Sequence, residues 1–225
     1  IDLQSGEVVT LAGSPQPGAV VPAVDGSAGR SGTARFSRPT ALAFAGTSVG
    51  SPLLIADSGA SAIRMLVDDA GGTGGSGGTV STIAGVLNQT NCFSATPTAV
   101  VAANTTLCAP AGLEFRPNDG RVYFTQPGNA VVRAVAVRGG GQTFGSAAQN
   151  DLHFVAGSPT GVDGTADGVG AAATFDFPQG IAVTNQGELV VGQIAALRRI
   201  RISSEGARVD TLAGSTTREI GNADG

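Results

Sequence analysis

The feature of this sequence that most constrains its fold is a recurring apolar residue followed by Ala-Gly. The copies end at Gly13, Gly85, Gly157 and Gly214, which places them 72, 72 and 57 residues apart. Each copy leads into a loop with many turn-forming residues. A signature that returns at such intervals indicates one supersecondary unit used several times. The repeat therefore predicts an architecture of similar units joined in series.

The composition favours short strands over long helices. The 225 residues include 35 glycines and no tryptophan, and only 4% are aromatic. Such a composition is typical of many tight turns between strands. All basic residues are arginine, and the net charge of -4 lacks the basic surface that a nucleic-acid phosphate backbone needs. No window is long and apolar enough to cross a bilayer. Because the chain opens on Ile1, we expect a processed or partial product.

Short apolar runs bounded by Gly, Pro and Asp predict four strands in each complete unit. The expected strands are 41–44, 53–56, 62–67 and 80–83; then 112–115, 121–125, 130–137 and 152–155; then 180–183, 187–191, 197–202 and 209–212. The complete units are expected at 14–85, 86–157 and 158–214. Residues 1–13, with a strand from Glu7 to Leu11, end a preceding unit, and 215–225 begin a following one. The predicted class is all-β.

The units resemble the blades of the NHL-repeat β-propeller family. The matching residues of one unit are Asp25-Gly26, Phe36, Pro39, Ile55-Ala-Asp57 and Ile63-Arg64; those of another are Asp167-Gly168, Phe175, Pro178, Gly180-Ile-Ala and Thr211-Leu-Ala-Gly214. The middle unit departs from the pattern, because Leu107 replaces the Phe and Gln126 the Asp. In the third unit, Gly192 lies near the Asp position and Leu197-Arg198 is shifted by about one residue. The resemblance implies four-stranded antiparallel blades, of which this chain holds three complete and two partial ones. It also implies a propeller of about six blades, whose remaining blades come from further sequence or, as the alternative, from another chain.

The two cysteines and two sequons gather before the middle unit. A disulfide between Cys92 and Cys108 would close a loop of fifteen intervening residues and contribute about 3 kcal/mol. The alternative is two thiols in a reducing compartment, and two sulfurs without a nearby His do not make a zinc site. Asn88 and Asn104 each begin a glycosylation sequon. Together these features favour an extracellular or cell-surface protein.

Several charged residues recur at repeated positions. Arg64 and Arg133 follow an apolar residue in the third predicted strand, and one arginine per unit indicates a structural role, such as binding loop carbonyls. Asp57 is expected to cap the turn that follows it. Asp25, Asp163, Asp167 and Asp224 all precede Gly, so turn formation accounts for them. Calcium at Asp163 and Asp167 is the alternative; otherwise no metal or cofactor is expected.

Glu114 and His153 are the two residues that do not fit the repeat. Glu114 takes the place that Ala43 and Ala182 hold in the other units. A buried carboxylate there needs a partner, such as Arg116 or Arg133, or a raised pKa; alternatively it lines the axial channel. His153, the sole histidine, lies in an outer strand, where packing explains it better than catalysis does.

The sequence therefore favours a non-enzymatic propeller that recognises proteins or glycans, or serves as a scaffold. Its partners would be other proteins or further domains of a larger protein. The alternative is a propeller lyase or metal-dependent hydrolase whose axial site is completed by blades outside this chain. No catalytic, cofactor-binding or metal-binding residue is assigned. RNA binding, known among intracellular NHL proteins, ranks last because the arginines are scattered and outnumbered by acids.

Overall fold

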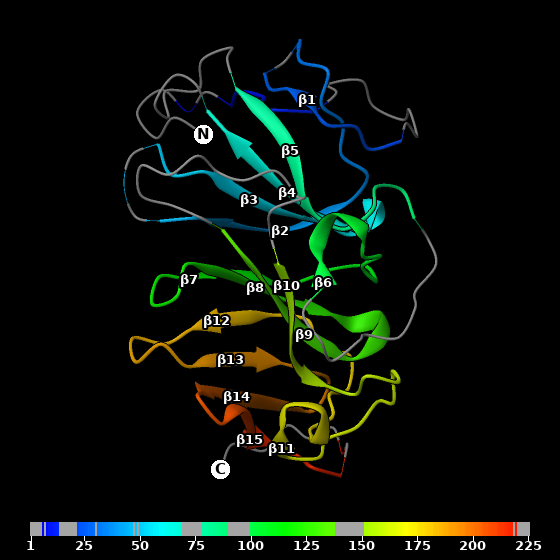
Figure 1. Cartoon of the computed structure of the whole chain (residues 1–225), viewed down its shortest axis with the longest axis vertical. Coiled ribbons are helices and arrows are strands. Elements are labelled where there is room, and N and C mark those ends of the chain that lie inside the picture. The colour runs from blue at the N-terminus through cyan, green and yellow to red at the C-terminus, as the bar shows by residue number, and fades with distance from the viewer. Residues whose placement is uncertain are drawn as a thin grey trace.

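The computed structural model describes residues 6, 8–13, 22–29, 31–46, 48, 50–68, 78–89, 100–137, 151–217 and 219. This part of the chain is all-β and forms three antiparallel five-stranded sheets, one for each predicted unit. Figure 1 shows the sheets one after another along the longest axis of the molecule. We call them the first, middle and third units.

The same strand order recurs in each sheet: the fifth strand of every unit lies between the first and the fourth strands. The first unit contains β1 (Gly26–Ser27), β2 (Pro39–Phe44), β3 (Leu53–Asp57), η1 (Ser58–Ala60), β4 (Ala62–Val67) and β5 (Thr79–Ala84). The middle unit contains β6 (Val100–Val101), η2 (Ala102–Asn104), β7 (Leu113–Arg116), β8 (Arg121–Gln126), η3 (Pro127–Asn129), β9 (Val131–Ala136) and β10 (Asp151–Gly157). The third unit contains β11 (Gly168–Val169), η5 (Gly170–Ala172), β12 (Ile181–Val183), β13 (Leu189–Gly192), β14 (Ala196–Ser203) and β15 (Gly206–Gly214).

Two expectations about the strands need correction. Each unit has five strands rather than four, because a two-residue strand (β1, β6 or β11) pairs with the outer strand of its unit. Two residues are too few to give an alternating pattern that sequence reasoning could recognise. Residues 8–11 of the expected strand 7–11 are not a strand. Val8 and Val9 are exposed there, and within the described chain no strand lies beside them to complete a ladder.

The sheets pack face to face through apolar side chains. Leu54 and Ile63 of the first unit meet Phe124 and Leu152 of the middle unit in one buried cluster. Val132 of the middle unit meets Phe175, Ile200 and others of the third unit in a second cluster. Both faces of the middle sheet are therefore covered, which explains why its strands are apolar on both sides.

The innermost strands β2, β7 and β12 lie side by side, and polar contacts join neighbouring units near them. The Thr40 hydroxyl donates to Pro110 O and to Ala111 O, both at 3.2 Å, and the Thr125 hydroxyl donates to Gln179 O at 2.6 Å. At Gly112 a β-carbon would lie 2.1 Å from Gln179 O. Only glycine lets the middle and third units approach this closely.

The repeated Ala-Gly has a steric cause. Gly85, Gly157 and Gly214 have φ values of 96°, 119° and 95°, a conformation that other residues rarely adopt. A β-carbon at these positions would lie 2.3 to 2.4 Å from a backbone carbonyl oxygen of the turn that precedes the fourth strand of the unit. The glycine therefore lets the outer strand end against that turn.

Candidate functional site

Arg64 is the centre of a polar network in the first unit, and its side chain is completely buried. Nε donates to Asp25 Oδ1 at 3.0 Å, and Nη1 donates to Asp57 Oδ2 at 3.2 Å. Nη1 and Nη2 also donate to two loop carbonyls, Arg35 O at 3.2 Å and Val24 O at 2.8 Å, which is the kind of partner that the sequence suggested. The guanidinium lies 5.2 Å from the centre of the Phe36 ring. Arg64 thus holds the loop before β2 against the sheet.

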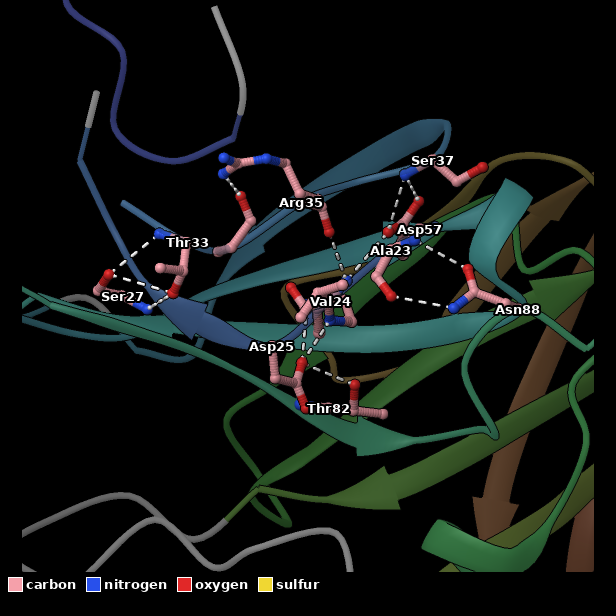
Figure 2. Close-up of polar contacts among 12 residues, drawn as sticks. Ala23, Val24, Asp25, Ser27, Thr33, Arg35, Ser37, Asp57, Thr82 and Asn88 are labelled. Carbon is pink, nitrogen blue, oxygen red and sulfur yellow. Dashed lines mark hydrogen bonds and ion pairs between the residues drawn. The ribbon is translucent and has the colours of Figure 1, made fainter. Parts of the chain in front are cut away.

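The two aspartates of this network do more than form turns. Asp57 was predicted to cap the turn that follows it, but its side chain makes no such hydrogen bond. Its carboxylate instead accepts hydrogen bonds from the backbone N–H groups of Ser37 and Arg38, at 3.0 and 2.9 Å. Asp25 accepts hydrogen bonds from the backbone N–H and the hydroxyl of Thr82, at 3.0 and 2.9 Å. Figure 2 shows Asp57 beside Ser37 and Asp25 beside Thr82. Both carboxylates take these partners because the Arg64 guanidinium holds them on its own side of the sheet.

The third unit repeats this network around Arg198, whose place in the sequence is shifted by about one residue from the repeat and which was not predicted to have this role. Arg198 pairs with Asp167 at 2.8 Å and lies 5.5 Å from the centre of the Phe175 ring. Burial alone would raise the pKa of Asp167, but hydrogen bonds from Thr211 and the Arg198 guanidinium lower it below its usual value. Gln193, rather than Gly192, takes the position of Asp57, and its Oε1 accepts from Arg198 Nη1 at 3.3 Å.

The middle unit keeps the arginine but not its partners. Arg133 lies opposite Phe154 in the sheet, as Arg64 lies opposite Thr82 and Arg198 opposite Thr211. Arg133 is 3% exposed and Gln126 is fully buried. Within the described part of the chain, Arg133 Nε and both polar atoms of the Gln126 amide have no hydrogen-bond partner. Burial lowers the pKa of Arg133 to about 10.

The predicted modification sites lie at the edge of the first and middle units. The Asn88 side-chain amide forms two hydrogen bonds with the backbone of Ala23: it accepts from the N–H at 2.8 Å and donates to the carbonyl at 3.0 Å (Figure 2). A glycan on Asn88 would replace one amide hydrogen and leave one for this bond. Asn104 ends η2 and is exposed. Cys108 is buried and is not a free thiol, whereas Cys92 lies outside the described residues.

Glu114 does not form the ion pair that the sequence suggested. Arg116 instead pairs with Asp119 at 2.6 Å and donates to Gly187 O at 2.7 Å. Among the described ion pairs none includes Glu114, and burial raises the pKa of its carboxyl. Because β7 lies between β2 and β12, Glu114 is a half-buried acid on the innermost strand of the middle unit.

A groove of about 370 Å³ lies between the middle and third units. Its lining includes Arg121, Tyr123, His153, Phe154 and Ser203. Burial, followed by the nearby Arg121 charge, lowers the pKa of His153. Burial and the hydrogen bond that the Tyr123 hydroxyl donates to Asp119 raise the pKa of Tyr123 to about 12. At neutral pH the groove therefore presents a neutral imidazole, a neutral phenol and one guanidinium.

The described residues contain no group of three His, Cys, Asp or Glu side chains placed to hold a metal ion. Asp167, half of the suggested calcium pair, is already bonded to Arg198, and Asp224 lies outside the described residues. No helix in the described part of the chain is long and apolar enough to span a membrane.

Comparison with known proteins gives a likeness in fold only. No protein-family model matches the sequence, and no curated protein matches it. An auxiliary nutrient binding protein from Bacteroides ovatus is 14% identical with a TM-score of 0.50; the match covers 80% of this chain but 37% of that one. A Trichoderma reesei protein of Carbohydrate-Active Enzymes Family AA12 is 15% identical, with a TM-score of 0.39 and coverages of 90% and 45%. Virginiamycin B lyase from Staphylococcus aureus is 12% identical, with a TM-score of 0.35 and coverages of 80% and 57%.

Proposed function

We propose that the chain is an arc of an NHL-type β-propeller that recognises proteins or glycans at the cell surface or outside the cell, without catalysing a reaction. The three units would be consecutive blades. The propeller assignment is supported by the recurring strand order and by the side-by-side innermost strands β2, β7 and β12. A row of units that each contact only their neighbours is typical of repeat architectures.

Further blades would cover the two ends of the row. Leu42 and Phe44 on β2 of the first unit are 61% and 63% exposed. At the other end, Ile194 and Leu197 of the third unit are 55% and 45% exposed. Apolar residues exposed at both ends of a repeat array favour a neighbouring unit on each side.

The observation that carries the recognition proposal is the groove between the middle and third units. Aromatic and arginine side chains are enriched where proteins bind one another, and the groove places Phe154, Tyr123 and Arg121 together. His153 and Ser203 add hydrogen-bonding groups suited to a sugar or a peptide backbone. The secretory part of the proposal is supported by the buried Cys108 and the exposed Asn104 sequon.

Binding of the purified protein to an array of defined glycans and purified extracellular proteins would test the proposal. We expect saturable binding to at least one arrayed molecule, and at least tenfold weaker binding by the Arg121→Ser/His153→Ala variant. Arg208→Ala is the matched control, because Arg208 is exposed and lies outside the groove. Equal binding by wild type and the groove variant would overturn the assignment of the groove.

Mass spectrometry of the protein secreted by eukaryotic cells would independently test whether the protein passes through the secretory pathway. The proposal expects a Cys92–Cys108 disulfide and glycans on Asn88 and Asn104. Free thiols and unmodified asparagines in the secreted protein would contradict an extracellular role.

One observation favours the enzyme alternative. Glu114 lies on an innermost strand and has a raised pKa, as a general acid requires. A lyase or hydrolase activity that Glu114→Gln abolishes, without changing the melting temperature, would favour this alternative over recognition.

A further inference from the structure

One side of the third unit combines apolar and positively charged side chains. On β14, Ile200 packs into the cluster that the third unit shares with the middle unit. Because side chains alternate along a strand, Leu197, Arg199 and Arg201 lie on the opposite side. Leu197 is 45% exposed and the Arg201 side chain 46%, and no described sheet covers them. We call this side of β14 and β15 the far face.

The charged part of the far face contains three arginines around one aspartate. Arg208 and Asp210 of β15 lie there, because Val209 between them packs towards the middle unit. Asp210 accepts hydrogen bonds from Arg201 and, at 3.2 Å, from Arg208. Arg199 lies 3.8 Å from Asp210 and forms no hydrogen bond with any described residue. The hydrogen bond from Arg201 lowers the pKa of Asp210, so this carboxylate is ionised at neutral pH and two positive charges remain in excess.

The other two units are apolar at the same places. Counted from the arginine that all three units share, Arg199 corresponds to Met65 and Ala134, which are 3% and 1% exposed. Arg201 corresponds to Val67, which is also packed against the middle unit. Met65 is covered by the middle unit and Ala134 by the third unit. This side of the sheet therefore receives the next unit through apolar contacts in the first and middle units, but presents charges in the third.

The rest of the far face keeps the pattern of the two visible interfaces. Leu197 corresponds to Ile63, and Leu212 corresponds to Ile83. Both isoleucines are buried where the first unit meets the middle unit. Leu212 is 48% exposed, like its neighbour on the far face. A partner that covers the far face must therefore supply apolar contacts at one end and negative charges at the other.

We propose that the far face docks a β-sheet unit whose facing strand carries an apolar residue and two carboxylates at alternate positions. Side chains at alternate positions of a strand are about 6.8 Å apart, so two such carboxylates match the spacing of Arg199 and Arg201. The apolar residue would meet Leu197. Arg208 lies directly opposite Arg201 in the sheet, and a carboxylate between these like charges would relieve their repulsion. The inference rests on the proposed further unit at this end of the row and adds the chemistry of its facing strand.

An acidic protein surface fits the far face better than an acidic polysaccharide does. A polysaccharide could neutralise the arginines but would leave Leu197 and Leu212 without an apolar contact. The two visible interfaces on this side of a sheet also join one sheet to another through apolar side chains. Continuity with these interfaces and the complementary charge together favour a β-sheet unit as the occupant.

A cyclic β-hairpin that presents Leu, Glu and Glu on one face of a strand is the probe, and the same hairpin with Gln in place of Glu is its control. Binding to the immobilised chain is measured by surface plasmon resonance. We expect wild type to bind the Glu hairpin about tenfold more tightly than the Gln hairpin. This preference should vanish in Arg199→Gln/Arg201→Gln and persist in Arg38→Gln, which removes an exposed arginine of the first unit. It should also weaken with added salt.

Reversing the charges keeps the test decisive. Arg199→Glu/Arg201→Glu should lose the Glu hairpin and prefer a hairpin with Lys in place of Glu. The groove variant Arg121→Ser/His153→Ala should bind the Glu hairpin as wild type does, so failure of the groove and failure of the far face are separate results. No binding of the Glu hairpin by wild type, or equal binding by Arg199→Gln/Arg201→Gln, would overturn the proposal. Heparin that binds through these two arginines when the hairpin does not would assign the far face to a sulfated polysaccharide and overturn it as well.

Discussion

Replacing Arg64 and Arg133 one at a time by methionine compares the same residue in two electrostatic settings. Both are buried and occupy the same strand position in their units. Arg64→Met leaves Asp57, whose side chain is completely buried, without its cationic partner. Breaking a buried ion pair from one side costs about 3–5 kcal/mol. The Asp25 side chain is 42% exposed, so losing its pair should add less than about 1 kcal/mol.

Arg133→Met should have a much smaller effect, because no described carboxylate loses a partner. Methionine fills a similar volume and removes the desolvation cost of the guanidinium, so the expected change in unfolding free energy is within about 1 kcal/mol in either direction. The assay is urea denaturation at low, constant ionic strength. Guanidinium chloride is unsuitable, since its ions screen the ion pairs that the comparison measures.

A double variant isolates the cause of the loss. In Arg64→Met/Asp57→Asn, the asparagine still accepts hydrogen bonds from the Ser37 and Arg38 N–H groups but carries no charge. It should recover more than half of the stability that Arg64→Met loses. Equal losses for Arg64→Met and Arg133→Met, or no recovery in the double variant, would refute the argument that an unpaired buried carboxylate dominates the cost.

Three further predictions concern single groups. Tyr123 is the sole tyrosine, so phenolate absorbance of the folded protein should show a pKa near 12, which falls but stays above 10 in Asp119→Asn. The contribution of Tyr123 to stability should be full below pH 10 and decline towards pH 12. A titration midpoint near 10 in the folded protein would contradict this prediction. The sole histidine, His153, should titrate below 6.5 by NMR and move upward in Arg121→Ser, and its contribution to stability should be lost as pH falls through that range. Gly157→Ala should cost at least about 2 kcal/mol by urea denaturation, whereas Gly161→Ala, where nothing lies within 4 Å of the added β-carbon, should cost less.

Sequence patterns predicted the strands of the three complete units because most are apolar runs between turn residues, and the structure places these twelve strands within a few residues of their predicted bounds. The Arg198 network was missed for a local reason. β3 and β8 are followed by a 3-10 turn before the next strand, whereas β13 reaches β14 through Gln193, Ile194 and Ala195 alone. The shorter turn shifts the arginine by one residue relative to the repeat.

The surroundings of Glu114 and the partner of Asp25 could not be predicted from local sequence. Arg116 lies two residues from Glu114 on the same face of the strand, yet Arg116 reaches Asp119 across the β7–β8 turn instead. Asp25 meets Thr82 across 57 residues of chain. Such a contact depends on how the sheet closes, which no short pattern encodes.

The contact between Asp25 and Thr82 also has a consequence for the order of folding. The aspartate lies before the first strand of its unit and the threonine on the last, so the bond cannot form until the ribosome has released the whole unit. Asp167 and Thr211, 44 residues apart, impose the same delay on the third unit. Contacts of such long sequence separation slow folding, because loop closure precedes any gain. We expect nascent chains that end before Thr82 to remain sensitive to protease, and chains that extend past Gly85 to gain protection in one step.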